Sequence, residues 1–327
     1  MAKIVRDRTA PGRRFTGLRR SFLVAVMTSA VLVGGVPASP AALFSGTPAS
    51  PAALVDPATS YVALGDSYTA GPGIPFQKFR PAGCARSDHN YPHLLGRRPG
   101  IPRLRDVSCS GAQTVHLTSP QRVAGGVNPP QLDALDAGTR LVTVGISGND
   151  IGFAEILRYC FSPVPVGTPC QRRYVAGGQD RISARIAQTA PRVAAVIAAI
   201  HRRSPRARVL VVGYPSILPD RGPGCWPVMP VTAADVPYLR AKNIELNAML
   251  AKQAAANGAT FVDTYTPSVG HDACALPGRR WVEPVVPVSP AAPVHPNAAG
   301  MAGIARAVLA TVGAPSSASV SLIATRA

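Results

Sequence analysis

Between residues 59 and 313, short apolar runs alternate with stretches that we expect to be helices, of which Arg181–Arg203 repeats apolar residues at helical spacing. The apolar runs predict strands, and all but the first carry the β-branched bias of buried parallel strands. They are Val62–Gly65, Leu104–Val107, Leu141–Ile146, Val209–Gly213 and Thr260–Val262. The helical stretches are Tyr91–Arg97, Arg181–Arg203, Asp235–Asn257 and Asn297–Val312. This alternation predicts an α/β fold with helices on both faces of a parallel sheet.

Two connections between these elements, Cys160–Gln179 and Tyr214–Pro237, are rich in proline and glycine. Both are longer than ordinary loops, and long loops in compact domains usually carry function. We therefore expect them to shape a binding site.

The two ends of the chain have a different composition from this domain, which we place at residues 59–313. Seven basic residues precede an uncharged apolar run, Phe22–Val36, and small residues follow it, so residues 1–38 are expected to be a signal peptide. The run is short for a membrane span, which disfavours an uncleaved anchor. Arg19-Arg20 resembles a twin-arginine signal, and an ordinary basic leader explains it equally well. We interpret the Pro/Ala/Ser-rich residues 39–58 as a linker and residues 314–327 as a flexible tail.

The chain carries a formal net charge of +18 over 327 residues. Residues 1–38 contribute +6 (seven basic, one acidic), which leaves +12 for the exported part. The basic residues are scattered, are mostly arginine and accompany no nucleic-acid-binding motif, so we expect no nucleic-acid partner. Contact with an anionic cell wall or lipid surface is the consequence that this charge would favour.

Six cysteines follow the expected cleavage site: Cys84, Cys109, Cys160, Cys170, Cys225 and Cys274. An even number in an exported chain predicts disulfides, and six cysteines allow fifteen connectivities. None forms a CxxC pair, which argues against zinc binding or thiol redox chemistry.

A candidate nucleophile follows the first predicted strand. Gly65-Asp66-Ser67 ends the apolar run, and the carboxyl edge of a parallel sheet is where α/β proteins bind ligands. Ser67 also lies where the free N–H groups of the next helix can face an anion. The simpler interpretation is that Ser67 only caps that helix.

Three features further along favour the chemical interpretation. Gly111 follows the second predicted strand and offers an unobstructed backbone N–H. Asn149 follows the third strand with an amide side chain, and His295 precedes the last helix as a base. Each has a structural explanation by itself, but together they supply a nucleophile, an oxyanion hole and a general base.

These motifs, in this order, resemble the SGNH (Gly-Asp-Ser-Leu) hydrolases, and in particular their secreted actinobacterial lipases and esterases. The resemblance implies a flavodoxin-like three-layer α/β/α sandwich around a five-stranded parallel sheet, without metal or organic cofactor. It makes Ser67 the nucleophile and His295 the base, with an oxyanion hole formed by Ser67, Gly111 and Asn149.

One position departs from that family's pattern. The residue three before the histidine is usually aspartate, and here it is Ala292. Either a main-chain carbonyl near Ala292 orients His295, which we favour, or a distant carboxylate does, with Glu283 and Asp272 as candidates. A non-catalytic lipid- or glycan-binding protein is the alternative that this gap supports.

The related lipases also imply sequential disulfides, which close the shortest loops: Cys84–Cys109, Cys160–Cys170 and Cys225–Cys274. The sequence is thus interpreted as a secreted, monomeric serine esterase or lipase that acts on small-molecule or lipid esters through an acyl-enzyme. An acetyl-glycan deacetylase or a thioesterase remains a second possibility. Neither acyl-chain length nor the natural substrate follows from the sequence.

Overall fold

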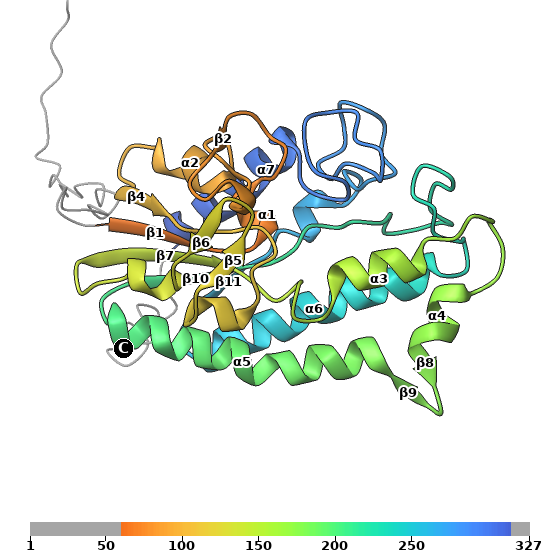
Figure 1. Cartoon of the computed structure of the whole chain (residues 1–327), viewed down its shortest axis with the longest axis horizontal. Coiled ribbons are helices and arrows are strands. Elements are labelled where there is room, and N and C mark those ends of the chain that lie inside the picture. The colour runs from red at the N-terminus through yellow and green to blue at the C-terminus, as the bar shows by residue number, and fades with distance from the viewer. Residues whose placement is uncertain (1–59, 315–327) are drawn as a thin grey trace, which may run out of the picture. The chain divides into compact units, whose positions relative to one another are not determined.

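The computed structural model describes residues 60–314 (Figure 1). The expected signal peptide and linker lie outside the described residues, as does the expected tail beyond Ala314. Within residues 60–314, no helix is both long and apolar enough to cross a membrane.

The centre of the fold is one five-stranded parallel sheet, as expected. Its strands are β1 (Ser60–Gly65), β4 (Arg103–Asp106), β7 (Thr139–Gly145), β10 (Arg208–Val212) and β11 (Thr260–Val262). Their spatial order is β11-β10-β7-β1-β4, and all four pairings are parallel. Each predicted strand is present, with ends that differ by two residues or fewer from the prediction.

This strand order is the flavodoxin-like one, in which the chain first adds a strand on one side of β1 and then continues on the other. The direction reverses between β1 and β7, which are direct neighbours with Gly65 opposite Gly145. In such sheets the crevice at the carboxyl ends of these two strands is the usual ligand site. Ser67 and Asn149 follow these two strands.

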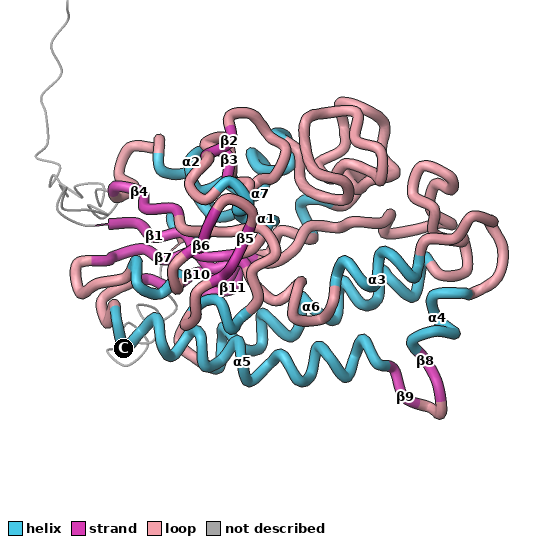
Figure 2. Tube along the Cα trace, in the orientation of Figure 1, coloured by secondary structure: helices cyan, strands magenta, loops and turns pink. Residues whose placement is uncertain are grey.

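Helices cover both faces of the sheet and make three layers (Figures 1 and 2). Helices α2 (Tyr91–Gly96) and α7 (Ala298–Gly313) lie on one face, and α5 (Arg181–Arg203) and α6 (Val236–Ala256) lie on the other. Alternate strand residues supply the two cores, because successive side chains of a strand point to opposite faces. Tyr61, Ala63, Leu210 and Val212 pack towards α2 and α7, whereas Val62, Leu64, Val209 and Val211 pack towards α5 and α6.

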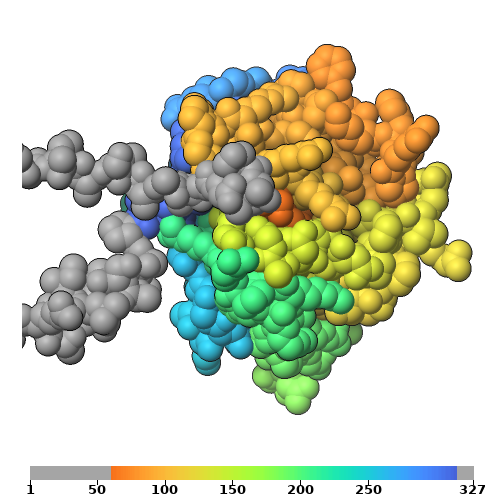
Figure 3. All heavy atoms as spheres, turned by 90° about the vertical axis from the view of Figure 1, so that its left-hand side faces the viewer, coloured from red at the N-terminus to blue at the C-terminus, as the bar shows by residue number. Residues whose placement is uncertain are grey.

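Figure 3 shows the end of the domain at which the strands begin, opposite the carboxyl edge that carries Ser67. The orange segments around α2 lie above and the green segments of α5 lie below, so that only a small part of β1 reaches the surface between them. Tyr61 to Leu64 are fully buried.

Several short elements were not predicted from the sequence. They are the helices α1 (Ser67–Ala70), α3 (Phe153–Cys160) and α4 (Pro169–Tyr174), and the two-stranded pairs β2 (Gln77–Lys78) with β3 (Arg86–Ser87), β5 (Gln121–Val123) with β6 (Gly126–Asn128), and β8 (Val175–Ala176) with β9 (Gln179–Asp180). The single-turn 3₁₀ helices are Ala82–Cys84, Thr114–Leu117, Gln131–Ala134 and Thr266–Ser268. Helix α4 and strand β8 lie within the connection Cys160–Gln179, which therefore contains regular structure.

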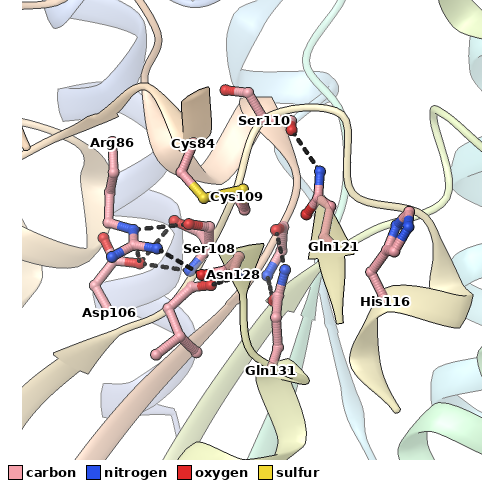
Figure 4. Close-up of a disulfide and its surroundings, with 12 residues drawn as sticks. Cys84, Arg86, Asp106, Ser108, Cys109, Ser110, His116, Gln121, Asn128 and Gln131 are labelled. Carbon is pink, nitrogen blue, oxygen red and sulfur yellow. Dashed lines mark hydrogen bonds and ion pairs between the residues drawn. A yellow bond between two sulfur atoms is a disulfide. The ribbon is translucent and has the colours of Figure 1, made fainter. Parts of the chain in front are cut away.

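Three disulfides join loops to this frame: Cys84–Cys109, Cys160–Cys170 and Cys225–Cys274. They have the sequential pairing that we expected. Figure 4 shows the first of them beside Ser108, whose hydroxyl donates to Asp106 (2.6 Å). The Arg86 guanidinium donates to the carbonyl of Ser108 (2.7 Å), so the loop after β4 is held on both sides.

Candidate active site

The turn from β1 into α1 positions Ser67 at the carboxyl edge of the sheet. Asp66 caps α1, with its Oδ1 accepting from the N–H of Tyr68 (2.9 Å), and Ser67 is the first helical residue. The Ser67 side chain is largely buried, so its hydroxyl opens only into the site. Its backbone N–H has no acceptor within residues 60–314, which leaves this donor free at a helix N-terminus.

Gly65 makes this turn possible. Its φ of 153° is unusual for other residues, and an added Cβ would lie 2.3 Å from Thr69 Oγ1 and 2.6 Å from the carbonyl of Gly145. The buried Gln131 side chain accepts from the Gly65 N–H (2.7 Å) and donates to the Gly65 carbonyl (2.9 Å). A single side chain therefore fixes both polar groups of the residue that precedes Asp66-Ser67, and its role was not foreseen from the sequence.

The loop before α7 brings His295 to Ser67 across 228 residues of sequence. His295 Nε2 lies 2.8 Å from Ser67 Oγ. Nδ1 lies 2.7 Å from the carbonyl oxygen of Pro293, which can only accept. Nδ1 therefore carries the proton, and Nε2 is left to accept from the Ser67 hydroxyl.

The Pro293 carbonyl reaches the ring because the next residue has an unusual backbone. Val294 has a φ of 56°, a conformation that β-branched residues rarely adopt. The Tyr68 hydroxyl donates to the Val294 carbonyl (2.7 Å) and holds it. The ring of Tyr68 also lies 5.0 Å from that of His295. The sequence pointed to a carbonyl near Ala292, but it could not show the strained turn that presents the carbonyl of Pro293.

Burial lowers the pKa of His295 below its usual value, and the hydrogen bond to Pro293 opposes this effect only in part. A neutral imidazole is the form that can accept a proton, so the environment favours the base at neutral pH.

Neither candidate carboxylate is hydrogen-bonded to His295. Glu283 is fully buried and accepts from Asn297 Nδ2 (2.6 Å) and the N–H of Val288 (2.8 Å). Asp272 accepts from the N–H of Cys274 (2.9 Å). Both carboxylates organise loops, and in residues 60–314 the only recorded partner of His295 Nδ1 is a main-chain carbonyl.

Asn149 lies in the loop after β7 and lines the same pocket as Ser67. Its Nδ2 donates to the carbonyl of Ala112 (2.9 Å), and its second amide hydrogen has no acceptor in the described part of the chain. Gly111, with φ 76°, precedes Ala112 and so lies beside Asn149. The Gly111 N–H is likewise without an acceptor among residues 60–314, although Gly111 does not line the pocket.

A buried tyrosine, which the sequence did not single out, connects these parts. The Tyr214 hydroxyl donates to Asp66 Oδ2 (2.5 Å) and accepts from the N–H of Gly148 (2.8 Å), next to Asn149. Burial raises the pKa of Asp66 to about 7, against the lowering effect of the Tyr214 bond. Tyr214 thereby joins the cap of the Ser67 helix to the Asn149 loop.

An apolar pocket opens beside Ser67 and Asn149. Its walls come from α3, from the connection after β10 and from α6, and they include Ile151, Phe153, Ile156, Leu157, Ile217, Leu218, Met229, Val231, Leu239 and Leu246. The expectation that long connections shape a site is right for Tyr214–Pro237. Among the described residues, Cys160–Gln179 contributes no wall to this pocket.

Comparison with known proteins identifies the family to which this chain is similar. The profile of the GDSL-like Lipase/Acylhydrolase family matches residues 63–302. Lipase 2 of Streptomyces coelicolor is 42% identical over 238 residues, which cover 70% of this chain and 78% of that protein. The crystal structure of phospholipase A1 from Streptomyces albidoflavus superposes with a TM-score of 0.65 at 28% identity, over 77% of this chain and 98% of that one.

The extracellular lipase of Streptomyces rimosus gives a TM-score of 0.64 at 30% identity and covers 77% of this chain and 99% of that one. The three disulfides and this likeness to an extracellular lipase are consistent with secretion. The chain belongs to the GDSL-like lipase/acylhydrolase family, and it is a carboxylic ester hydrolase.

Proposed function

We propose that Ser67 is the nucleophile of this hydrolase and that His295 is its general base, as a dyad without a carboxylate. The main support is a pair of hydrogen bonds made by His295. Its Nδ1 lies 2.7 Å from the Pro293 carbonyl oxygen, and its Nε2 lies 2.8 Å from Ser67 Oγ. His295 takes the proton of Ser67 as Oγ attacks the ester carbonyl, and it returns this proton to the leaving alcohol. Water then hydrolyses the acyl-enzyme by the same route.

The oxyanion of the tetrahedral intermediate is bound by three donors in this proposal. They are the backbone N–H groups of Ser67 and Gly111 and the side-chain amide of Asn149, each with an N–H that no group in residues 60–314 accepts. Loss of one such donor typically costs about 10²–10³ in turnover.

The acyl group of the substrate occupies the apolar pocket. Ten apolar side chains form its walls, far more contact than an acetyl group needs, which favours a lipase or esterase over an acetyl-glycan deacetylase. Because the similar Streptomyces albidoflavus protein is named a phospholipase A1, glycerophospholipids belong in the substrate panel. We also propose that residues 1–38 direct export and that the enzyme acts as a monomer.

Ser67→Ala tests this function. We expect ester hydrolysis to fall to background and labelling by a serine-directed phosphonate to disappear, while the melting temperature stays near that of the wild type. Ser110→Ala, a serine in the neighbouring loop, serves as the control and should keep both labelling and turnover. Turnover close to wild type in Ser67→Ala would refute the mechanism, and a panel of acetyl, long-chain acyl and thioester substrates would show which class the pocket accepts.

A further inference from the structure

Two exposed loops next to the pocket form an apolar surface that the ester chemistry does not use. Pro163-Val164-Pro165-Val166 follows α3, and Trp226-Pro227-Val228 lies in the connection after β10. All seven residues are exposed, with 51% and 70% exposure at Val164 and Val166 and 39% at Trp226. We call these seven residues the apolar knob.

The two loops lie side by side although about 60 residues separate them. Trp226 Nε1 donates to the carbonyl of Ser162 (3.2 Å), and the Ser162 N–H donates to the carbonyl of Pro230 (2.7 Å). The Thr232 hydroxyl donates to the carbonyl of Gly167 (2.8 Å). In Figure 1 both loops extend beyond α3, past the carboxyl edge of the sheet.

Disulfides hold both halves of the knob in place. Cys160–Cys170 closes the loop that carries the two valines, and Cys225–Cys274 anchors the residue before Trp226. Exposed apolar side chains in water are unfavourable unless they have a partner, and here the chain holds seven of them in one arrangement. A fixed apolar surface loses little conformational entropy when it binds.

The charge around the knob indicates the partner. Residues 158–179 contain three arginines and no acidic residue, whereas Arg221, which precedes the second loop, lies 3.9 Å from the carboxylate of Asp220. Arg158, Arg172 and Arg173 are exposed, and the Arg173 guanidinium lies 3.3 Å from the centre of the Tyr159 ring. A tryptophan and short apolar side chains, with exposed arginines on both sides of one of the two loops in the sequence, suit a bilayer interface with anionic headgroups.

The knob also borders the pocket. Met229 directly follows Val228 of the knob, and it lines the pocket beside Ser67. Leu157, near the end of α3, lines the same pocket. We propose that the apolar knob docks this enzyme on an anionic phospholipid surface, with Val164, Val166, Trp226 and Val228 in the interface and the arginines on the headgroups. Docked in this way, the enzyme has its pocket next to the source of acyl chains.

Sedimentation with phospholipid vesicles tests the docking in the Ser67→Ala protein, which leaves the lipid intact. We expect binding to vesicles of phosphatidylcholine with phosphatidylglycerol, weaker binding to phosphatidylcholine alone, and loss of binding at high salt. Val164→Ser/Val166→Ser should lower the partition coefficient about tenfold, because two partly inserted valines lose apolar contact. Quenching of tryptophan by brominated acyl chains should be lost with Trp226→Phe.

The chain offers a matched control for each change. Val286 and Val288 also flank a proline and are 78% and 67% exposed, so Val286→Ser/Val288→Ser should leave binding within about twofold of the parent. Arg172→Gln/Arg173→Gln should weaken binding to anionic vesicles about tenfold, whereas Arg202→Gln/Arg203→Gln at the end of α5 should not.

Three results would overturn the docking: no vesicle binding, equal losses from both valine pairs, or binding to cell-wall polymer without binding to vesicles. Vesicle binding by the Ser67→Ala protein does not depend on which residue is the nucleophile. In the active protein, Val164→Ser/Val166→Ser should keep turnover of a water-soluble ester, so failure of the docking and failure of the proposed chemistry are distinguishable.

Discussion

At the residue scale, the site depends on backbone conformations that are unfavourable in isolation. Val294, with φ 56°, turns the Pro293 carbonyl onto His295, and Ser147, with φ 118°, begins the loop that carries Asn149. Conformations of this kind cost about 1–3 kcal/mol each and persist only when the surroundings determine them. Here Tyr68 holds Val294, and Tyr214 holds the residue after Ser147.

The pH dependence of turnover follows from the environment of His295. Burial lowers its pKa, so the rate should rise through a pH below about 6.5 and stay high into the alkaline range, because the neutral imidazole is the base. A pH profile of kcat/KM on a soluble ester measures this value. A carboxylate partner would instead favour the imidazolium and move the rise above 6.5.

Asp272→Asn provides the complementary measurement on the same ester. The side chain does not contact His295, so turnover should remain within a few-fold of wild type. A loss of about 10⁴, the size known for the aspartate of a serine protease triad, would show that a third member acts at a distance.

Removing the Tyr214 hydroxyl should affect turnover more than substrate binding. Tyr214→Phe leaves the Gly148 N–H without its acceptor and Asp66 Oδ2 without the Tyr214 donor, and an unpaired buried group costs about 1–3 kcal/mol. We expect kcat to fall about 10–100-fold with little change in KM, because the Asn149 loop loses its position. Tyr238→Phe, which removes a tyrosine bond to Asp180 and touches neither Asp66 nor Gly148, is the matched control. Equal kcat values for the two variants would exclude a positioning role for Tyr214.

At the scale of single elements, α7 shows how packing overrides helix propensity. Trp281 packs against two glycines of this helix. A Cβ added at Gly303 would lie 2.4 Å from two atoms of the Trp281 ring, and a Cβ added at Gly300 would lie 2.3 Å from the Trp281 carbonyl oxygen. Alanine is the better helix former by about 1 kcal/mol, yet these glycines allow the loop before His295 to lie close to the helix. The position of α7 is thus linked to the position of the loop that leads to His295.

Gly303→Ala should therefore destabilise the protein by about 1–3 kcal/mol, the usual effect of overpacking, in spite of the gain in propensity. Gly313→Ala in the same helix has no atom within 4 Å of the added Cβ and should be neutral or slightly stabilising. Thermal unfolding of both variants measures the difference. A stabilised Gly303→Ala would mean that Trp281 moves away freely.

At the scale of the whole molecule, three disulfides join segments that lie outside the central sheet. The closed loops span 25, 10 and 49 residues. If each disulfide stabilises the protein by lowering the entropy of the unfolded chain, these lengths correspond to about 3.5, 2.7 and 4 kcal/mol of folding free energy. The loop closed by Cys225–Cys274 contains Met229 and Val231 of the pocket wall.

Replacing Cys225 and Cys274 with serine should lower both stability and turnover, because the pocket loop loses its anchor. Replacing Cys160 and Cys170 should lower stability less and leave turnover of a soluble ester near wild type, since that loop lines no pocket wall among residues 60–314. Denaturant unfolding and ester hydrolysis of the two double variants test the contrast. The reverse order of the two effects on turnover would contradict the assigned pocket.

The sequence by itself was sufficient to predict the three-layer α/β/α architecture of this protein and the hydrolase family to which it belongs. The strands follow from short apolar runs, and α5 follows from apolar residues at helical spacing, patterns that these segments carry without reference to the rest. Ser67, Asn149 and His295 could be named because they follow or precede those elements in a recognisable order. Helix α3 was missed, although Ile156 and Leu157 lie one turn after Phe153, because it lies within an otherwise irregular stretch.

Only the tertiary structure decided how the site is held. Three sets of contacts hold it: the Pro293 carbonyl at His295, the Gln131 side chain at Gly65, and the Tyr214 hydroxyl between Asp66 and Gly148. These contacts join residues that no repeating pattern in the sequence relates. The apolar knob likewise exists only because two loops, about 60 residues apart, meet through Ser162. Local patterns specify elements because each helix or strand has its own repeat, whereas a site depends on long-range contacts that form only when those elements pack.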